Sequence, residues 1–186
     1  LSDLLDNMYR EEYSIYYQLF LEYIEYKNRP LSWIGIDPTL DSESVYYPTD
    51  WIIFFRRTSD VGIAFPEEFL HHIQNYFYPD MGDYYQIDYE FEAKFSRDLC
   101  DQENNNGVCS LSGMGKNYPG DYSQWLDDIY YYNVYPYEPA DFDKMYYFFL
   151  EDFVALGNTL GTYPGSPQYS EPLLGKTVLS YYGYWF

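Results

Sequence analysis

The chain has few basic residues: 10 Lys and Arg stand against 30 Asp and Glu in 186 residues, giving a formal net charge of −20. Proteins that bind nucleic acid need the opposite charge to contact phosphate groups. The balance therefore disfavours a nucleic-acid partner. It suits an acidic docking protein, or a mimic of nucleic acid, that binds a basic partner at rates that fall as salt is raised.

The chain also lacks long apolar runs. The longest are Trp51–Phe55 and Met145–Leu150, far short of the roughly 18 apolar residues that cross a bilayer as a helix. The sequence thus predicts no transmembrane segment, although aromatic side chains permit peripheral membrane contact. The first residue is Leu1, so either a targeting segment has been removed or the numbering begins inside a longer product.

Histidine is scarce, and this limits metal and catalytic sites. His71 and His72 follow Glu68 at the spacing of carboxylate-bridged metal sites, but such sites need further ligands on a facing helix. The sequence predicts no metal, no cofactor and a polar helix face here. It contains no Gly-x-Ser-x-Gly motif. Carboxylate pairs are abundant, but 30 acids produce pairs without any catalytic role, so no catalytic residue is predicted and a non-enzymatic function is favoured.

Only two cysteines occur, Cys100 and Cys109. A disulfide between them would stabilise the fold by about 2–3 kcal/mol in an oxidising compartment. Two reduced thiols in a cytosolic or matrix protein are the alternative. The chain has no Asn-x-Ser/Thr site, which weighs against a glycosylated secreted protein.

Aromatic residues are abundant instead: 27 Tyr, 13 Phe and 4 Trp make up 24% of the chain. Disordered chains are depleted in these side chains, so the chain is predicted to fold. Its length suits a single globular domain over residues 1–186.

The patterning predicts an α+β fold with three main helices. Prolines mark their ends, because Pro30 stops the first while Pro66 and Pro139 begin the second and third. Most of the circumference of the first helix is apolar, more than one core-facing side needs. The three helices are predicted over about residues 3–27, 66–78 and 139–156.

A small antiparallel sheet is predicted to complete the fold. The clearest strand signal is the alternation of apolar with acidic residues in segment 84–95. Residues 30–50 are rich in Pro, Gly, Ser and Asp and are predicted to form an ordered connection; residues 122–132 are predicted to form a short helix. The three strands are predicted over about residues 51–57, 84–95 and 177–182.

The aromatic excess leads to a functional hypothesis. Clustered tyrosines cannot all face inward, and Tyr is enriched where proteins meet. We expect a non-catalytic accessory or structural subunit that buries an aromatic surface in a larger assembly of other protein subunits. An organelle membrane system such as the mitochondrial intermembrane space would suit it, with secretion as the alternative. The residues predicted to contact a partner are Tyr9, Tyr13, Tyr16, Phe20, Tyr23, Tyr181, Tyr182, Tyr184, Trp185 and Phe186.

A second hypothesis is carbohydrate binding or glycoside processing, since Tyr and Trp rings stack on sugars and carboxylates bind hydroxyl groups. The residues that would test it are Trp33, Trp51, Trp125 and Trp185.

Overall fold

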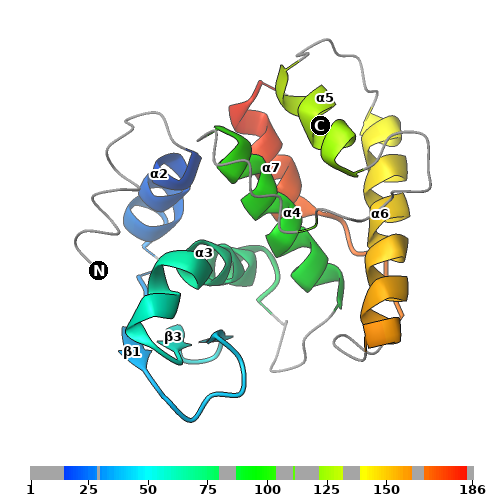
Figure 1. Cartoon of the computed structure of the whole chain (residues 1–186). Coiled ribbons are helices and arrows are strands. Elements are labelled where there is room, and N and C mark those ends of the chain that lie inside the picture. The colour runs from blue at the N-terminus through cyan, green and yellow to red at the C-terminus, as the bar shows by residue number, and fades with distance from the viewer. Residues whose placement is uncertain are drawn as a thin grey trace. The chain divides into compact units, whose positions relative to one another are not determined.

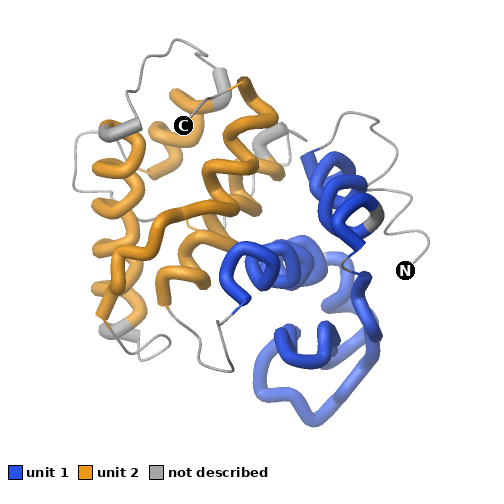
Figure 2. The backbone as a smooth tube through the Cα atoms, turned by 180° about the vertical axis from the view of Figure 1, so that it is seen from behind, with its two compact units in different colours: residues 1–85 blue, residues 86–186 orange. Residues whose placement is uncertain are grey.

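The computed structural model confirms the predicted α+β class. It describes residues 15–28, 30–79, 87–103, 111, 122–131, 139–160 and 166–183. The chain groups into two compact units, residues 1–85 and residues 86–186 (Figure 2). The sequence predicts no boundary at this point, and the single domain over residues 1–186 stays a prediction.

The sheet of the first unit has three short strands, β1 (Trp33–Ile36), β2 (Ser44–Tyr47) and β3 (Ile52–Phe55). Their order is β1-β3-β2, with β3 parallel to β1 and antiparallel to β2. The strand predicted over 51–57 is therefore confirmed as β3, but the sheet is mixed and not purely antiparallel. β1 and β2 lie in the segment 30–50 predicted as a connection, because four-residue strands are too short to show alternation among prolines and glycines.

Helix α3 (Val61–Phe77) covers one face of this sheet (Figure 1), after the 3-10 turn η2 (Thr58–Asp60). It confirms the helix predicted over 66–78 but begins five residues before Pro66. Phe65 and Phe69 stack with centroids 6.0 Å apart, and Phe65 lies 6.4 Å from Phe55 of β3. These rings form the core between helix and sheet.

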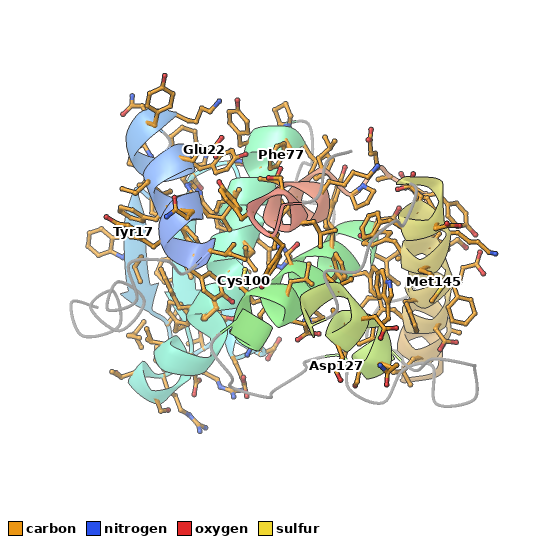
Figure 3. All side chains as sticks on the ribbon, turned by 90° about the horizontal axis from the view of Figure 1, so that it is seen from above. Tyr17, Glu22, Phe77, Cys100, Asp127 and Met145 are labelled. Atoms are coloured by element: carbon orange, nitrogen blue, oxygen red, sulfur yellow. The ribbon has the colours of Figure 1, made fainter. Side chains whose placement is uncertain are left out.

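The described part of the predicted helix 3–27 is α2 (Ile15–Leu19) followed by the π-helix η1 (Phe20–Tyr26); residues 3–14 lie outside the described residues. The ring of Tyr23 packs against Tyr76 and Phe77 at centroid distances of 5.1 and 5.5 Å. Figure 3 labels Glu22 and Phe77, which mark where η1 and the end of α3 meet.

The second unit contains four helices in its described residues: α4 (Ile87–Glu103), α5 (Tyr122–Tyr131), α6 (Pro139–Leu160) and α7 (Leu173–Tyr181). α5 and α6 confirm the helices predicted over 122–132 and 139–156, although α6 continues past Gly157. α4 contacts α5, α6 and α7. Aromatic rings of these helices form the core, with Trp125 stacked 5.1 Å from both Phe95 and Phe149. Figure 3 shows side chains filling the space beside α6, where Met145 is labelled.

Two predicted strands of this unit are wrong. Segment 84–95 contributes most of its residues to α4, because Ile87, Phe91, Phe95 and Leu99 also recur every four residues and all four are buried. Segment 177–182 lies mainly in α7, although Thr177, Val178 and Tyr181 favour strands. Tertiary contacts with α4 outweigh that propensity: a Cβ on Gly175 would lie 3.1 Å from the Phe95 ring, so the two helices approach closely there.

Two of the acidic residues that produced the false alternation, Asp88 and Glu92, accept hydrogen bonds from backbone N–H groups. Asp88 accepts from Gln168 and Ser170 at 3.0 and 2.8 Å. Glu92 accepts from Leu174 and Gly175 at 2.8 and 3.2 Å, at the first turn of α7. Both carboxylates are buried. Glu92 binds donors that a helix start cannot satisfy within itself and so holds α7 against α4, while Asp88 holds the segment that leads into α7.

Candidate functional site

A buried polar seam joins α3 to the inner face of the sheet. Ser44 and Tyr46 of β2 point to that face, where Glu68 and His72 stand one turn apart on α3. The Ser44 hydroxyl donates to Oε1 of Glu68 at 2.5 Å, and the Tyr46 hydroxyl lies 3.1 Å from Nδ1 of His72. The seam thus ties one helix to one strand through two polar pairs at matched spacing.

Further groups complete the surroundings of Tyr46. The Asn75 amide donates to the Tyr46 oxygen at 3.4 Å and to the Pro48 carbonyl at 3.2 Å. Burial raises the pKa of the Tyr46 phenol above its ordinary value of 10.0, and the hydrogen bond from Asn75 opposes that shift. Trp51 sets its ring edge-on to His72 with centroids 6.1 Å apart. The phenol is therefore held neutral inside the unit.

The residues tested above as metal ligands have separate partners in this seam. Glu68 binds Ser44, His72 meets Tyr46, and Nδ1 of His71 lies 2.8 Å from Oε1 of Gln74 within α3. All three are buried. Sequence analysis predicts a polar helix face here, whereas the structure places this polar face inside, against β2. The Ser44–Glu68 and Tyr46–His72 contacts fix α3 on the sheet, whereas the His71–Gln74 contact lies within the helix.

The opposite side, which we call the outer sheet face, is apolar. Strand pairing places residues of one face side by side, with Trp33 and Tyr47 flanking Ile52, and Val45 next to Phe54. Trp33 is 61% exposed and Tyr47 is 42% exposed. The outer sheet face consists of Trp33, Gly35, Val45, Tyr47, Ile52 and Phe54.

Gly35 allows the aromatic rings of this face to lie close together. A Cβ at this position would stand 2.6 Å from Nε1 of Trp33 and 2.8 Å from Cε1 of Phe54. The absent side chain therefore leaves room for the indole over the strand. Tyr47 meets Phe54 edge to face, with centroids 6.0 Å apart. The result is a contiguous aromatic surface in place of scattered rings.

The predicted partner-contact residues that the structure describes are not part of the outer sheet face. Tyr16 and Tyr23 are buried, which leaves little of either for a partner. Phe20 and Tyr181 are half-buried, as is Tyr182, whose hydroxyl donates to the Leu99 carbonyl at 2.6 Å. The remaining predicted contacts lie outside the described residues: Tyr9, Tyr13, Tyr184, Trp185 and Phe186.

The tryptophans proposed for sugar binding differ in burial. Trp125 is buried in the core of the second unit, and Trp51 is half-buried against His72. Trp185 lies outside the described residues. Trp33 alone of the three described tryptophans offers an exposed ring. The signal that could have found the outer sheet face was Trp33-x-Gly35, a large ring next to a residue without a side chain.

The predicted disulfide stays a prediction. Cys100 is buried in α4 (Figure 3), and Cys109 lies outside the described residues. None of the helices described in the structure has the length and hydropathy to span a membrane.

Comparison of the chain with protein-family models, with curated proteins and with solved structures finds no match.

Proposed function

We propose that this chain is a non-catalytic interaction subunit that buries the outer sheet face against another protein. The observation that carries the proposal is the clustering of exposed Trp33 and Tyr47 with Phe54 on one apolar face. Contiguous exposed apolar surface marks interaction sites, and Trp and Tyr are enriched among the residues that dominate binding energy at the centres of interfaces.

The size of the face suggests its place in the interface. Three strands of four residues span about 13 Å by 10 Å, well below the roughly 800 Å² that a standard interface buries on each partner. The outer sheet face is thus the centre of the contact, and polar residues around it would form the rim. With a net charge of −20, the chain favours a partner of opposite charge.

An apolar fluorescent dye tests whether the face is a binding surface. We expect the double variant Trp33→Ser/Tyr47→Ser to lose most of the dye fluorescence seen with the unaltered chain. The matched control is Leu156→Ser/Tyr169→Ser, since these two residues are exposed to a similar degree but belong to the second unit and not to the outer sheet face. Far-UV circular dichroism checks that both variants fold. Equal dye signals from both variants would contradict the proposal.

Photo-crosslinking then identifies the partner class. A photoreactive phenylalanine in place of Tyr47 should give one recurrent protein adduct in the cell of origin, and the same probe at Tyr169 should not. If neither position gives a protein adduct, the chain is not an interaction subunit of this kind.

The exposed indole of Trp33 favours carbohydrate binding as a second candidate, because a flat exposed ring can stack on a sugar. A glycan array combined with Trp fluorescence tests it: a bound glycan should quench the unaltered chain and leave Trp33→Phe weakly affected. An array without binders removes this candidate.

A further inference from the structure

One edge of the three-stranded sheet is open in the part of the chain that the structure describes. The Asp37 N–H donates to the Phe55 carbonyl at 2.9 Å, continuing the parallel ladder between β1 and β3. Backbone groups alternate in direction along a strand, so Gly35 also faces β3. The N–H and C=O groups of Ile34 and Ile36 consequently face away from β3, toward the open edge.

The four residues of β1 include no Lys, no Pro and no charged side chain. Natural edge strands carry Lys, Pro or inward-pointing charges that prevent pairing with another chain. β1 reads Trp-Ile-Gly-Ile, and its ends, Trp33 and Ile36, are 61% and 47% exposed. The other edge differs, because the Ser42 hydroxyl donates to the Ser44 carbonyl of β2 at 2.6 Å. β1 is therefore the edge suited to pairing.

The acidic residues near β1 favour a basic partner. Asp37, Asp41 and Glu43 follow β1, and the last two are exposed. The Thr39 hydroxyl and N–H donate to the Asp37 carboxylate at 2.6 and 2.9 Å, and these bonds lower its pKa. Arg56 and Arg57 follow β3 at this end, and Arg56 already lies 3.9 Å from the Asp60 carboxylate, so acidic residues outnumber cations here. A second copy of the chain would bring another net charge of −20 to the same edge.

We infer that β1 accepts an extended, basic segment of a partner protein, which pairs with Ile34 and Ile36 as a fourth strand of the sheet. This inference rests on the proposed function and specifies how the partner binds. Strand addition gives affinity through main-chain hydrogen bonds and specificity through alternate side chains. The added strand would bring every second side chain beside Trp33 and so enlarge the outer sheet face.

Peptides of defined charge provide the probe. An acetylated octapeptide of alternating Lys and Val should bind about tenfold more tightly than its Glu–Val counterpart in low salt, and should lose this advantage as salt rises. Binding would be measured by fluorescence anisotropy of labelled peptide against the whole chain. Equal affinity for the two peptides, or binding of neither, overturns the inference.

An edge variant tests the place of binding. Proline at position 36 removes an N–H that faces the open edge while leaving the β1–β3 ladder intact. Ile36→Pro should weaken Lys–Val binding by about tenfold, as expected for loss of an edge hydrogen bond and the strand geometry. The control Ile36→Thr, which keeps the N–H, should stay within about twofold. If the proline variant binds as well as the threonine variant, the peptide does not pair with β1.

Amide hydrogen exchange tests pairing at β1 in the unaltered chain, without any substitution. Bound Lys–Val peptide should slow exchange at Ile34 and Ile36 and leave Asp37, already bonded to Phe55, unchanged. Unaltered exchange at Ile34 and Ile36 overturns strand addition. The proposed function would still stand if the dye and crosslinking results support it, because those experiments do not depend on the open edge.

Discussion

Tyr46 shows how a single residue can hold a helix on a sheet. Its phenol lies between His72 and Asn75 of α3, and its ring packs edge-on to His72 with centroids 5.6 Å apart. A buried hydroxyl is stabilising only if its hydrogen bonds are made. Burial of the Tyr46 hydroxyl is therefore stable only with its hydrogen-bond partners on α3, and the same hydrogen bonds hold α3 against β2.

The raised pKa of Tyr46 predicts a loss of stability in alkali. The folded state keeps the phenol proton to higher pH than the unfolded chain, whose tyrosines ionise near pH 10. The contribution of the buried Tyr46 phenol to the free energy of unfolding is complete below about pH 10. Above that pH it falls by up to about 1.4 kcal/mol per pH unit. Urea unfolding at several pH values should show a shallower decline for Tyr46→Phe than for the unaltered chain.

Other tyrosines provide the control for this measurement. Burial also raises the pKa of Tyr147, the phenol of which is less enclosed than that of Tyr46. Tyr147→Phe should therefore change the alkaline slope less than Tyr46→Phe does. Identical slopes for Tyr46→Phe and the unaltered chain would mean that the phenol is not enclosed as described.

The sequence predicts part of this seam. The polar spacing of Glu68, His71 and His72 identified a polar helix face, but their partners Ser44 and Tyr46 lie in a segment without strand signals. Which polar residues become buried depends on contacts between distant segments, and periodicity within one helix carries no information about them.

At the scale of elements, α4 and α7 show why local patterns fail. Alternation in 84–95 fits a strand, yet the same residues place Ile87, Phe91 and Phe95 on one helical stripe. The buried Asp88 and Glu92 are stable only because segment 166–175 supplies N–H donors. By contrast, α3, α5 and α6 were predictable because apolar periodicity and proline or glycine signals lie within the segments themselves.

Glu92 should be the main anchor of α7. Glu92→Ala leaves the N–H groups of Leu174 and Gly175 without their buried acceptor, and we expect a loss of about 2–4 kcal/mol in the free energy of unfolding. Glu92→Gln keeps one acceptor oxygen without the charge and should lose about half as much. Urea unfolding measures both, and hydrogen exchange should accelerate first in α7.

The matched control is Glu171→Gln. The Glu171 carboxylate pairs with Lys176 at 3.2 Å on an exposed side chain, and such pairs contribute about 0–1 kcal/mol. If Glu171→Gln and Glu92→Gln cost the same, burial of Glu92 is not what stabilises α7.

For the whole molecule, the described aromatic residues are divided between buried cores and exposed positions. Most described rings of the second unit pack against each other, as around Trp125, whereas the first unit leaves Trp33 and Tyr47 exposed on one face. Composition predicted that some rings would remain outside, but their position depends on β1 and β2, which the sequence did not reveal.

The net charge also acts on the molecule as a whole. With 30 acidic and 10 basic residues, carboxylates outnumber cations three to one, and their mutual repulsion opposes the compact state. Screening by salt reduces this repulsion. We therefore expect the free energy of unfolding to rise by about 1–2 kcal/mol between roughly 10 and 300 mM NaCl, as measured with urea, which adds no ions.

The triple variant Asp41→Asn/Glu43→Gln/Asp50→Asn separates repulsion from other effects of salt. It removes three exposed carboxylates of the first unit, so its stability should start higher in low salt and respond less to NaCl. Salt would act on burial of apolar surface equally in both proteins, and an equal response would therefore point to that effect. A fall in stability with salt would show that ion pairs such as Lys176–Asp143 outweigh the repulsion among the carboxylates.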